Sequence, residues 1–162
     1  INHAIKIINY GLNNLSVCYL IFRILLINCG MKKIDHIGIA VKNIEQSNEL
    51  FSKLFNRPPF HQEILDTQQL AVSFFKLEDT KIELIHPISE KSTVHKYLEN
   101  KGEGIHHVAF EVEDIYAEIE RLKGEGFLPL SEKPYVGALN KLVCFFHPKT
   151  TNGVLIELCQ KQ

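Results

Sequence analysis

Two histidines and two glutamates stand at matching places in two similar halves of this sequence. His36 and His107 lie in stretches of similar sequence, 71 positions apart. Glu83 and Glu157 lie in a second pair of similar stretches, 74 positions apart. Imidazole and carboxylate groups are the usual protein ligands of divalent first-row metal ions. If the two halves pack face to face, these four side chains can converge on one metal ion.

The repeat predicts that each half contains a strand, a helix and further strands. We expect the first half to span about 33–88 and the second about 104–160. In the first strand, the period of two places His36 on the same face as Gly38 and Ala40, which leaves room there for a ligand. The aliphatic residues of the other face suit packing against a helix.

Capping residues and apolar periodicity place the other elements. Helices are predicted over 44–55 and from 115 to about 124, with a short polar helix or loop over 92–101. Strands are predicted over 71–77, 80–85, 142–146 and 154–159, and a loop over 133–140. Each half therefore carries its histidine in its first strand and its glutamate in its last.

Neighbouring residues in a strand point to opposite faces, which limits the number of side chains that can reach one site. Asp35 is expected to point away from the face of His36, and His106 away from the face of His107. We therefore expect only His107 of the adjacent pair to reach the metal, and His106 to have a structural role.

The composition predicts one globular domain without nucleic-acid or membrane partners. The chain has 162 residues, of which 45% are hydrophobic, enough to bury a sound core. The net charge of −1 excludes a strong electrostatic attraction to nucleic acid or to an anionic membrane surface. The four cysteines show no CxxC spacing, so neither a zinc knuckle nor a disulfide framework is predicted. Reduced cysteines in a cytoplasmic protein are the simplest interpretation.

Residues 1–30 differ in composition from the rest of the chain. They contain no Asp or Glu, and their apolar run 17–27 is interrupted by Arg23. That run is shorter than the ~20 residues that a membrane helix needs, so no membrane span is predicted. Three interpretations stay open: sequence upstream of a natural start at Met31, a targeting segment, or an extra helix packed on the domain. We therefore assign the functional domain to 31–162.

Five short motifs occur in a characteristic order. They are DHIGIAV (35–41), TKIELIHP (80–87), GEGIHHVAFEV (102–112), FHPK (146–149) and GVLIEL (153–158). Together they resemble the vicinal-oxygen-chelate superfamily, which contains glyoxalases, bleomycin resistance proteins and dioxygenases. Within that superfamily, the order and spacing of the motifs resemble the methylmalonyl-CoA epimerases most.

The resemblance implies an α+β fold in which two βαβββ modules form a half-open mixed β-barrel around a metal site. It implies a divalent metal ion, with Co, Mn, Ni and Zn as candidates. The implied ligands are His36, Glu83, His107 and Glu157. The resemblance also implies a homodimer with a small acyl-CoA substrate. The protein would lie in the cytoplasm, or in the mitochondrial matrix if residues 1–30 are a transit segment.

In the implied reaction, the two C2 epimers of methylmalonyl-CoA interconvert by proton removal and return through a metal-stabilised enolate. Inversion requires acid/base groups on opposite faces of the planar intermediate. We assign these roles to Glu157 and Asp66, with Glu63 as a weaker candidate for the second role.

Two other functions stay open. A lactoylglutathione lyase of the glyoxalase I type uses the same His, Glu, His, Glu ligand set. A metal-free small-molecule-binding protein of the resistance type shares the fold but normally lacks the full ligand set. The linker between Glu83 and His107 and the turn 147–149 favour the epimerase over the lyase.

Overall fold

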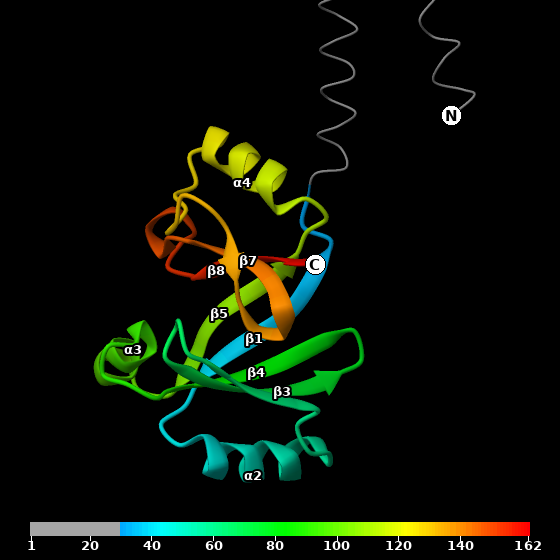
Figure 1. Cartoon of the computed structure of the whole chain (residues 1–162), viewed down its shortest axis with the longest axis vertical. Coiled ribbons are helices and arrows are strands. Elements are labelled where there is room, and N and C mark those ends of the chain that lie inside the picture. Colours follow the sequence, from blue (N-terminus) through cyan, green and yellow to red (C-terminus); the bar gives the residue numbers. More distant parts are fainter. Residues whose placement is uncertain (1–29) are drawn as a thin grey trace, which may run out of the picture. The chain divides into compact units, whose positions relative to one another are not determined.

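The repeated halves of the sequence fold as two βαβββ modules that share one sheet (Figure 1). The structure is a computed structural model that describes residues 30–162, so the expectations for residues 1–29 lie outside the described part. The first module contains β1 (Lys33–Ala40), α2 (Ile44–Phe55), β2 (His61–Leu65), β3 (Leu70–Leu77) and β4 (Thr80–Pro87). The second contains β5 (Gly104–Glu111), α4 (Ile115–Gly124), β6 (Tyr135–Val136), β7 (Lys141–Phe146) and β8 (Ile156–Lys161). The remaining elements are α3 (Thr93–Lys101) between the modules and the short 3-10 helices η2 (Ala138–Asn140) and η3 (Pro148–Thr150).

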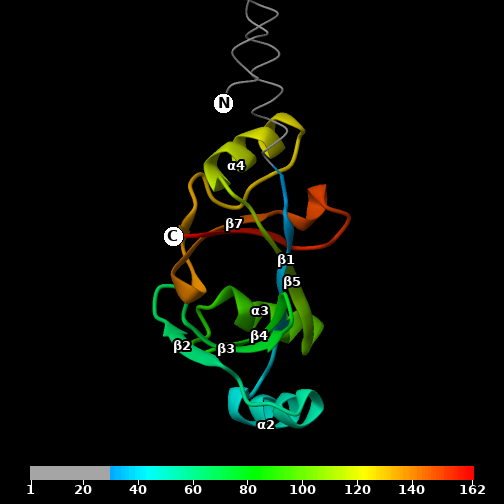
Figure 2. The same cartoon turned by 90° about the vertical axis from the view of Figure 1, so that its right-hand side faces the viewer.

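The described strands form one curled, mixed sheet in the order β2-β3-β4-β1-β5-β8-β7-β6. The antiparallel pair of β1 and β5 lies at its centre and joins the two modules. Each of these strands is flanked by the last strand of its own module, since β4 runs parallel to β1 and β8 parallel to β5. Figures 1 and 2 show the sheet curling between α2 at one end of the domain and α4 at the other. The predicted half-open α+β barrel is therefore confirmed.

Each module covers the outer surface of the sheet with a capped amphipathic helix. Asn43 and Asp114 cap α2 and α4, because each side chain accepts a hydrogen bond from the backbone N–H three residues later. The apolar faces pack on the sheet through Ile44, Phe51 and Phe55 in α2 and through Ile115, Ile119 and Leu122 in α4. The inner surface of the sheet is thereby left for the site. Of the helices in the described residues, none is both long and apolar enough to cross a bilayer.

The strand register places the four candidate ligands in two neighbouring rows across the sheet. His36 on β1 lies opposite Ala109 on β5, which lies opposite Glu157 on β8. In the next row, Glu83 on β4 lies opposite Gly38 on β1, which lies opposite His107 on β5. Each histidine therefore shares a row with the glutamate of the other module, with a small residue between them.

Two irregularities in the pairing of β1 with β5 change where neighbouring side chains point. In β1, Ile34 and His36 have partners in β5, but Asp35 between them has none. In β5, Ile105 and His107 have partners in β1, but His106 between them has none. A β-bulge of this kind adds one residue to one strand and redirects its side chain. The strict alternation expected for these strands is therefore wrong at Asp35 and His106, and both side chains lie beside the histidine that follows them.

Candidate metal and active site

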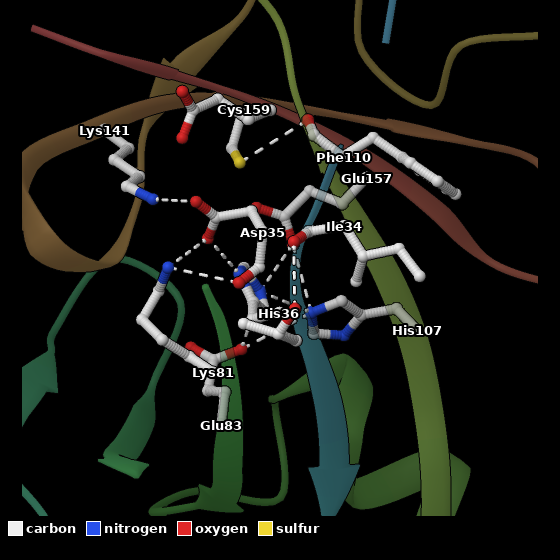
Figure 3. A network of polar contacts seen from close by, with 12 residues as sticks. Ile34, Asp35, His36, Lys81, Glu83, His107, Phe110, Lys141, Glu157 and Cys159 are labelled. Carbon is white, nitrogen blue, oxygen red and sulfur yellow. Dashed lines mark hydrogen bonds and ion pairs between the residues drawn. The ribbon is translucent and has the colours of Figure 1, made fainter. Parts of the chain in front are cut away.

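The structure brings all four predicted ligands together on the inner surface of the sheet (Figure 3). The two Nε2 atoms of His36 and His107 lie 3.1 Å apart. Glu83 Oε2 lies 3.3 Å from the first of these nitrogens and 3.4 Å from the second. Glu157 Oε2 lies 3.5 Å and 3.1 Å from the same two atoms. One oxygen of each carboxylate therefore lies within 3.5 Å of both imidazole nitrogens.

These spacings fit one metal ion. Two ligand atoms at about 2.1 Å from an ion lie about 3.0 Å apart at a right angle and about 3.4 Å apart at the tetrahedral angle. The five distances between the imidazole nitrogens and the other donors run from 3.1 to 3.5 Å. The donor chemistry also fits, because neutral imidazole and carboxylate bind divalent first-row ions. The cluster of four residues can therefore hold such an ion.

The close approach of the two modules depends on a glycine between the ligands. A Cβ atom on Gly38 would lie 2.1 Å from Cε1 of His107 and 2.4 Å from its Nδ1. The imidazole of His107 therefore occupies the space over Gly38 that a side chain would fill. Ala109, the residue at the matching place in β5, is fully buried next to His36 in the register.

All four candidate ligands are at least 95% buried, so their charges interact strongly. Burial alone lowers the pKa of His36 and of His107, but the carboxylates of Glu83 and Glu157 outweigh it and raise both values above 6.5. Burial alone raises the pKa of the two glutamates, and the imidazolium groups outweigh it. They lower the pKa of Glu83 to about 2 and also lower that of Glu157. Without a metal, the two carboxylates thus stabilise the protonated form of each histidine, and the histidines stabilise the ionised form of each glutamate.

This charge pattern predicts that the stability of the metal-free protein falls at alkaline pH. The raised pKa values of His36 and His107 contribute stability that is complete below 6.5 and is lost as the pH rises through them. The lowered values of Glu83 and Glu157 contribute stability that is complete above 4.5 and is lost only at lower pH. We expect the thermal unfolding midpoint of the metal-free protein to decrease as the pH is raised from 6 to 9. The midpoint of a His107→Gln variant should decrease less over the same range. A midpoint that is constant or rises over this range would contradict the pairing.

A second group of potential ligands is less suited to a cation. Asp35, His36 and Cys159 also offer buried donor atoms close together. However, Asp35 already pairs with the ammonium groups of Lys81 at 2.9 Å and Lys141 at 2.5 Å. Two cations at that carboxylate would repel a metal ion. Burial also raises the pKa of the Cys159 thiol, which disfavours the thiolate that metals bind.

A cavity of about 340 Å³ opens beside the cluster and is lined by all four candidate ligands. One wall is apolar and comes from β3, β4 and α3. Its side chains are Val72, Phe74, Ile85 and Val94. Such a wall suits the alkyl part of a small ligand and keeps water away from the polar cluster.

The second predicted acid, Asp66, is exposed and is not among the residues that line the cavity. It lies in the turn between β2 and β3, where its neighbours Leu65 and Gln68 line the cavity, so Asp66 stays a candidate for the second role. The carboxylate of Glu63, the weaker candidate, is engaged in hydrogen bonds within the fold. Its Oε1 accepts hydrogen bonds from the backbone N–H of Leu139 at 2.7 Å and from His61 Nε2 at 3.0 Å. It therefore ties β2 to the loop before β7, where the two edges of the half-barrel approach each other.

Sequence reasoning missed four polar residues around the site: Asp35, Lys81, His106 and Lys141. Asp35, His106 and Lys141 line the cavity, and Lys81 contacts Asp35. One signal was available, because Asp35 and His106 are 71 positions apart, the same offset as the two ligand histidines. No local pattern could reveal that Lys141 contacts Asp35 across 106 positions of sequence.

Comparison with known proteins identifies the family of this chain. Residues 35–145 match the Glyoxalase/Bleomycin resistance protein/Dioxygenase superfamily. The ethylmalonyl-CoA/methylmalonyl-CoA epimerase of Cereibacter sphaeroides is 39% identical over 130 residues, which are 79% of this chain and 97% of the relative. The mitochondrial methylmalonyl-CoA epimerase of Dictyostelium discoideum is 37% identical over 133 residues, 82% of this chain and 80% of the relative.

A solved structure is similar in sequence and fold. A methylmalonyl-CoA epimerase in complex with methylmalonyl-CoA and NH4+ is 31% identical, with a TM-score of 0.79 over 82% of this chain and 96% of that one. Both the sequence and the arrangement of the two modules are thus shared with the epimerases. This chain therefore belongs to the glyoxalase/bleomycin resistance protein/dioxygenase superfamily, in the group that contains the methylmalonyl-CoA epimerases.

Proposed function

We propose that this protein interconverts the two C2 epimers of methylmalonyl-CoA with the help of a divalent metal ion. Its relationship to two epimerases at 37% and 39% identity makes it an enzyme of the epimerase class. The observation that carries the metal-dependent mechanism is the buried cluster of two imidazoles and two carboxylates at the cavity. The proposed ligands are His36, Glu83, His107 and Glu157.

The C2 proton of a methylmalonyl thioester lies between two carbonyl groups, and its removal leaves negative charge on their oxygens. When bound, the divalent ion would supply Lewis-acid stabilisation of that charge. The protein itself contributes the dry, apolar wall and the acid/base groups. The two histidines and two glutamates of the cluster would hold the ion at the wall of the cavity in which the substrate would bind.

Glu83 and Glu157 are the two carboxylates we propose for proton transfer. They come from equivalent strands of the two modules, and in the sheet order these strands flank the β1–β5 pair on either side. A substrate held over the two histidines would thus have one carboxylate toward each face. One carboxylate removes the C2 proton and the other returns a proton to the opposite face, which inverts the centre. Asp66, the acid predicted from the sequence for the second role, is exposed in the turn after β2 and is the alternative to Glu83.

Deuterium exchange tests the proposed function. Protein loaded with cobalt or manganese is mixed with one epimer of methylmalonyl-CoA in heavy water. We expect deuterium at C2 and equilibration of the epimers, with turnover at least about 10²-fold lower after metal removal, because metal stabilisation is worth several kcal/mol. Restoring the metal should restore turnover.

The lyase provides the contrasting outcome. No C2 exchange, together with turnover of a methylglyoxal–glutathione adduct, would assign the protein to the glyoxalase I type. Exchange that is unaffected by metal removal would contradict metal dependence while leaving the epimerase assignment in place. The homodimer and the cytoplasmic location remain predictions.

A further inference from the structure

We propose that Asp35 and His106 are matched positioning residues, which hold the rings of His36 and His107 with their Nε2 atoms toward the metal. The inference rests on the proposed metal site and concerns the residues behind its ligands. A histidine that binds a metal through Nε2 carries its proton on Nδ1, and the acceptor of that proton sets the tautomer and the ring orientation.

The two positioning residues arise from the same structural device in both modules. Each immediately precedes its histidine, and each is the residue that the β1–β5 register skips. Regular alternation would point each of these side chains away from the neighbouring histidine. Each bulge instead turns its side chain toward the Nδ1 atom of that histidine. Because the bulges lie at equivalent positions of the repeat, packing alone is a poor explanation for both.

Asp35 is held in place from both modules (Figure 3). Its Oδ1 accepts a hydrogen bond from His36 Nδ1 at 2.8 Å. Lys81 of the first module pairs with the same oxygen at 2.9 Å, and Lys141 of the second pairs with Oδ2 at 2.5 Å. The Asp35 carboxylate is only 1% exposed, and without these two cations it would be a costly buried charge. The two lysines therefore balance its charge and fix it as an acceptor.

His106 supplies an acceptor of a different kind. Its Nδ1 lies 3.0 Å from His107 Nδ1, so one of these nitrogens must donate and the other accept. If His107 Nε2 faces the metal, its Nδ1 donates, and His106 accepts as a neutral imidazole. The ring of Tyr97 packs edge-on at 4.8 Å and holds His106 from the other side.

The two halves of the site are therefore unequal. A carboxylate behind His36 raises the basicity of that ligand more than a neutral imidazole behind His107 can. We expect the loss of Asp35 to weaken metal binding at least as much as the loss of His106.

Cobalt binding by calorimetry and the visible spectrum of the bound ion test the inference. The variant His106→Phe keeps the ring volume and removes the acceptor, whereas His106→Asn keeps an acceptor. Because Asp35→Asn alone would leave buried lysines without a partner, it is combined with Lys141→Met. We expect His106→Phe and the double variant to weaken cobalt binding about 10–100-fold and to alter the spectrum. His106→Asn should stay closer to wild type.

Thermal unfolding of the metal-free His106 variants separates positioning from folding, since these two proteins should unfold at similar temperatures. Wild-type affinity and spectrum in both His106→Phe and the double variant would overturn the inference and leave the proposed function intact. Equal weakening in His106→Asn and His106→Phe would overturn it for His106. A wild-type protein that binds no cobalt would overturn both the inference and the metal site.

Discussion

Replacement of Glu157 by glutamine is expected to lower the rate of epimerisation by about 10²–10⁴-fold while the metal stays bound. An amide oxygen can still act as a ligand, but the amide cannot take up and return a proton at neutral pH. Glu83→Gln should have an effect of similar size, because Glu83 is buried at the same cluster and approaches it from the other module. The measurements are the rate with each epimer and the bound metal per protein.

Deuterium exchange at C2 without inversion of configuration tests the two-carboxylate mechanism more sharply than the overall rate does. In Glu157→Gln, the epimer whose proton faces Glu83 should still exchange its C2 hydrogen for deuterium, but without changing configuration. In Glu83→Gln, the other epimer should do so. A general defect of folding or metal binding would instead reduce exchange of both epimers in both variants, and that outcome would contradict the two-carboxylate mechanism.

Asp66, which the sequence predicted for the second proton-transfer role, can be tested by the same kind of substitution. The same carboxylate-to-amide change at this exposed turn position, Asp66→Asn, is expected to leave the rate within about twofold of wild type, as for most exposed substitutions. A loss comparable to that of Glu83→Gln would assign the second proton-transfer role to Asp66.

The replacement of Gly38 by alanine is expected to destroy the metal site through one methyl group. The added Cβ would lie 2.1, 2.4 and 2.6 Å from three atoms of the His107 ring, so the ring must leave its place. We expect metal affinity to fall at least about 100-fold and epimerisation to fall with it, since displaced ligands cost at least as much as weakened support behind them. The overpacking itself should cost about 1–3 kcal/mol of stability. Metal titration and thermal unfolding measure the two effects.

The same substitution at Gly124 is the control. A Cβ there meets no atom within 4 Å, and the residue lies at the end of α4. Gly124→Ala should bind metal as wild type does and should be as stable or slightly more stable, because alanine favours the helix by up to about 1 kcal/mol. Metal binding by Gly38→Ala equal to that of this control would show that the ring of His107 can move aside without losing its function.

Much of the fold could be predicted because its signals are local. The helix expected over 44–55 is α2, and its Asn43 cap forms the predicted hydrogen bond. Caps and apolar periodicity depend on residues within a few positions of each other, so the chain carries them without its tertiary contacts. The short strand β6 lay in a segment expected to be a loop, because its two residues form a strand only by pairing with β7.

The sequence by itself determined the two-module plan and the four side chains that meet at its centre. A repeat that preserves histidine and glutamate in matching strands implies that these residues converge when the modules pair. Only the tertiary structure decided what stands around them. The bulges at Asp35 and His106 depend on the register between β1 and β5. The position of the Asp35 carboxylate depends on its ion pair with Lys141 from a distant strand. A one-residue change in register reverses the direction of a side chain, and partners far apart in the chain set that register.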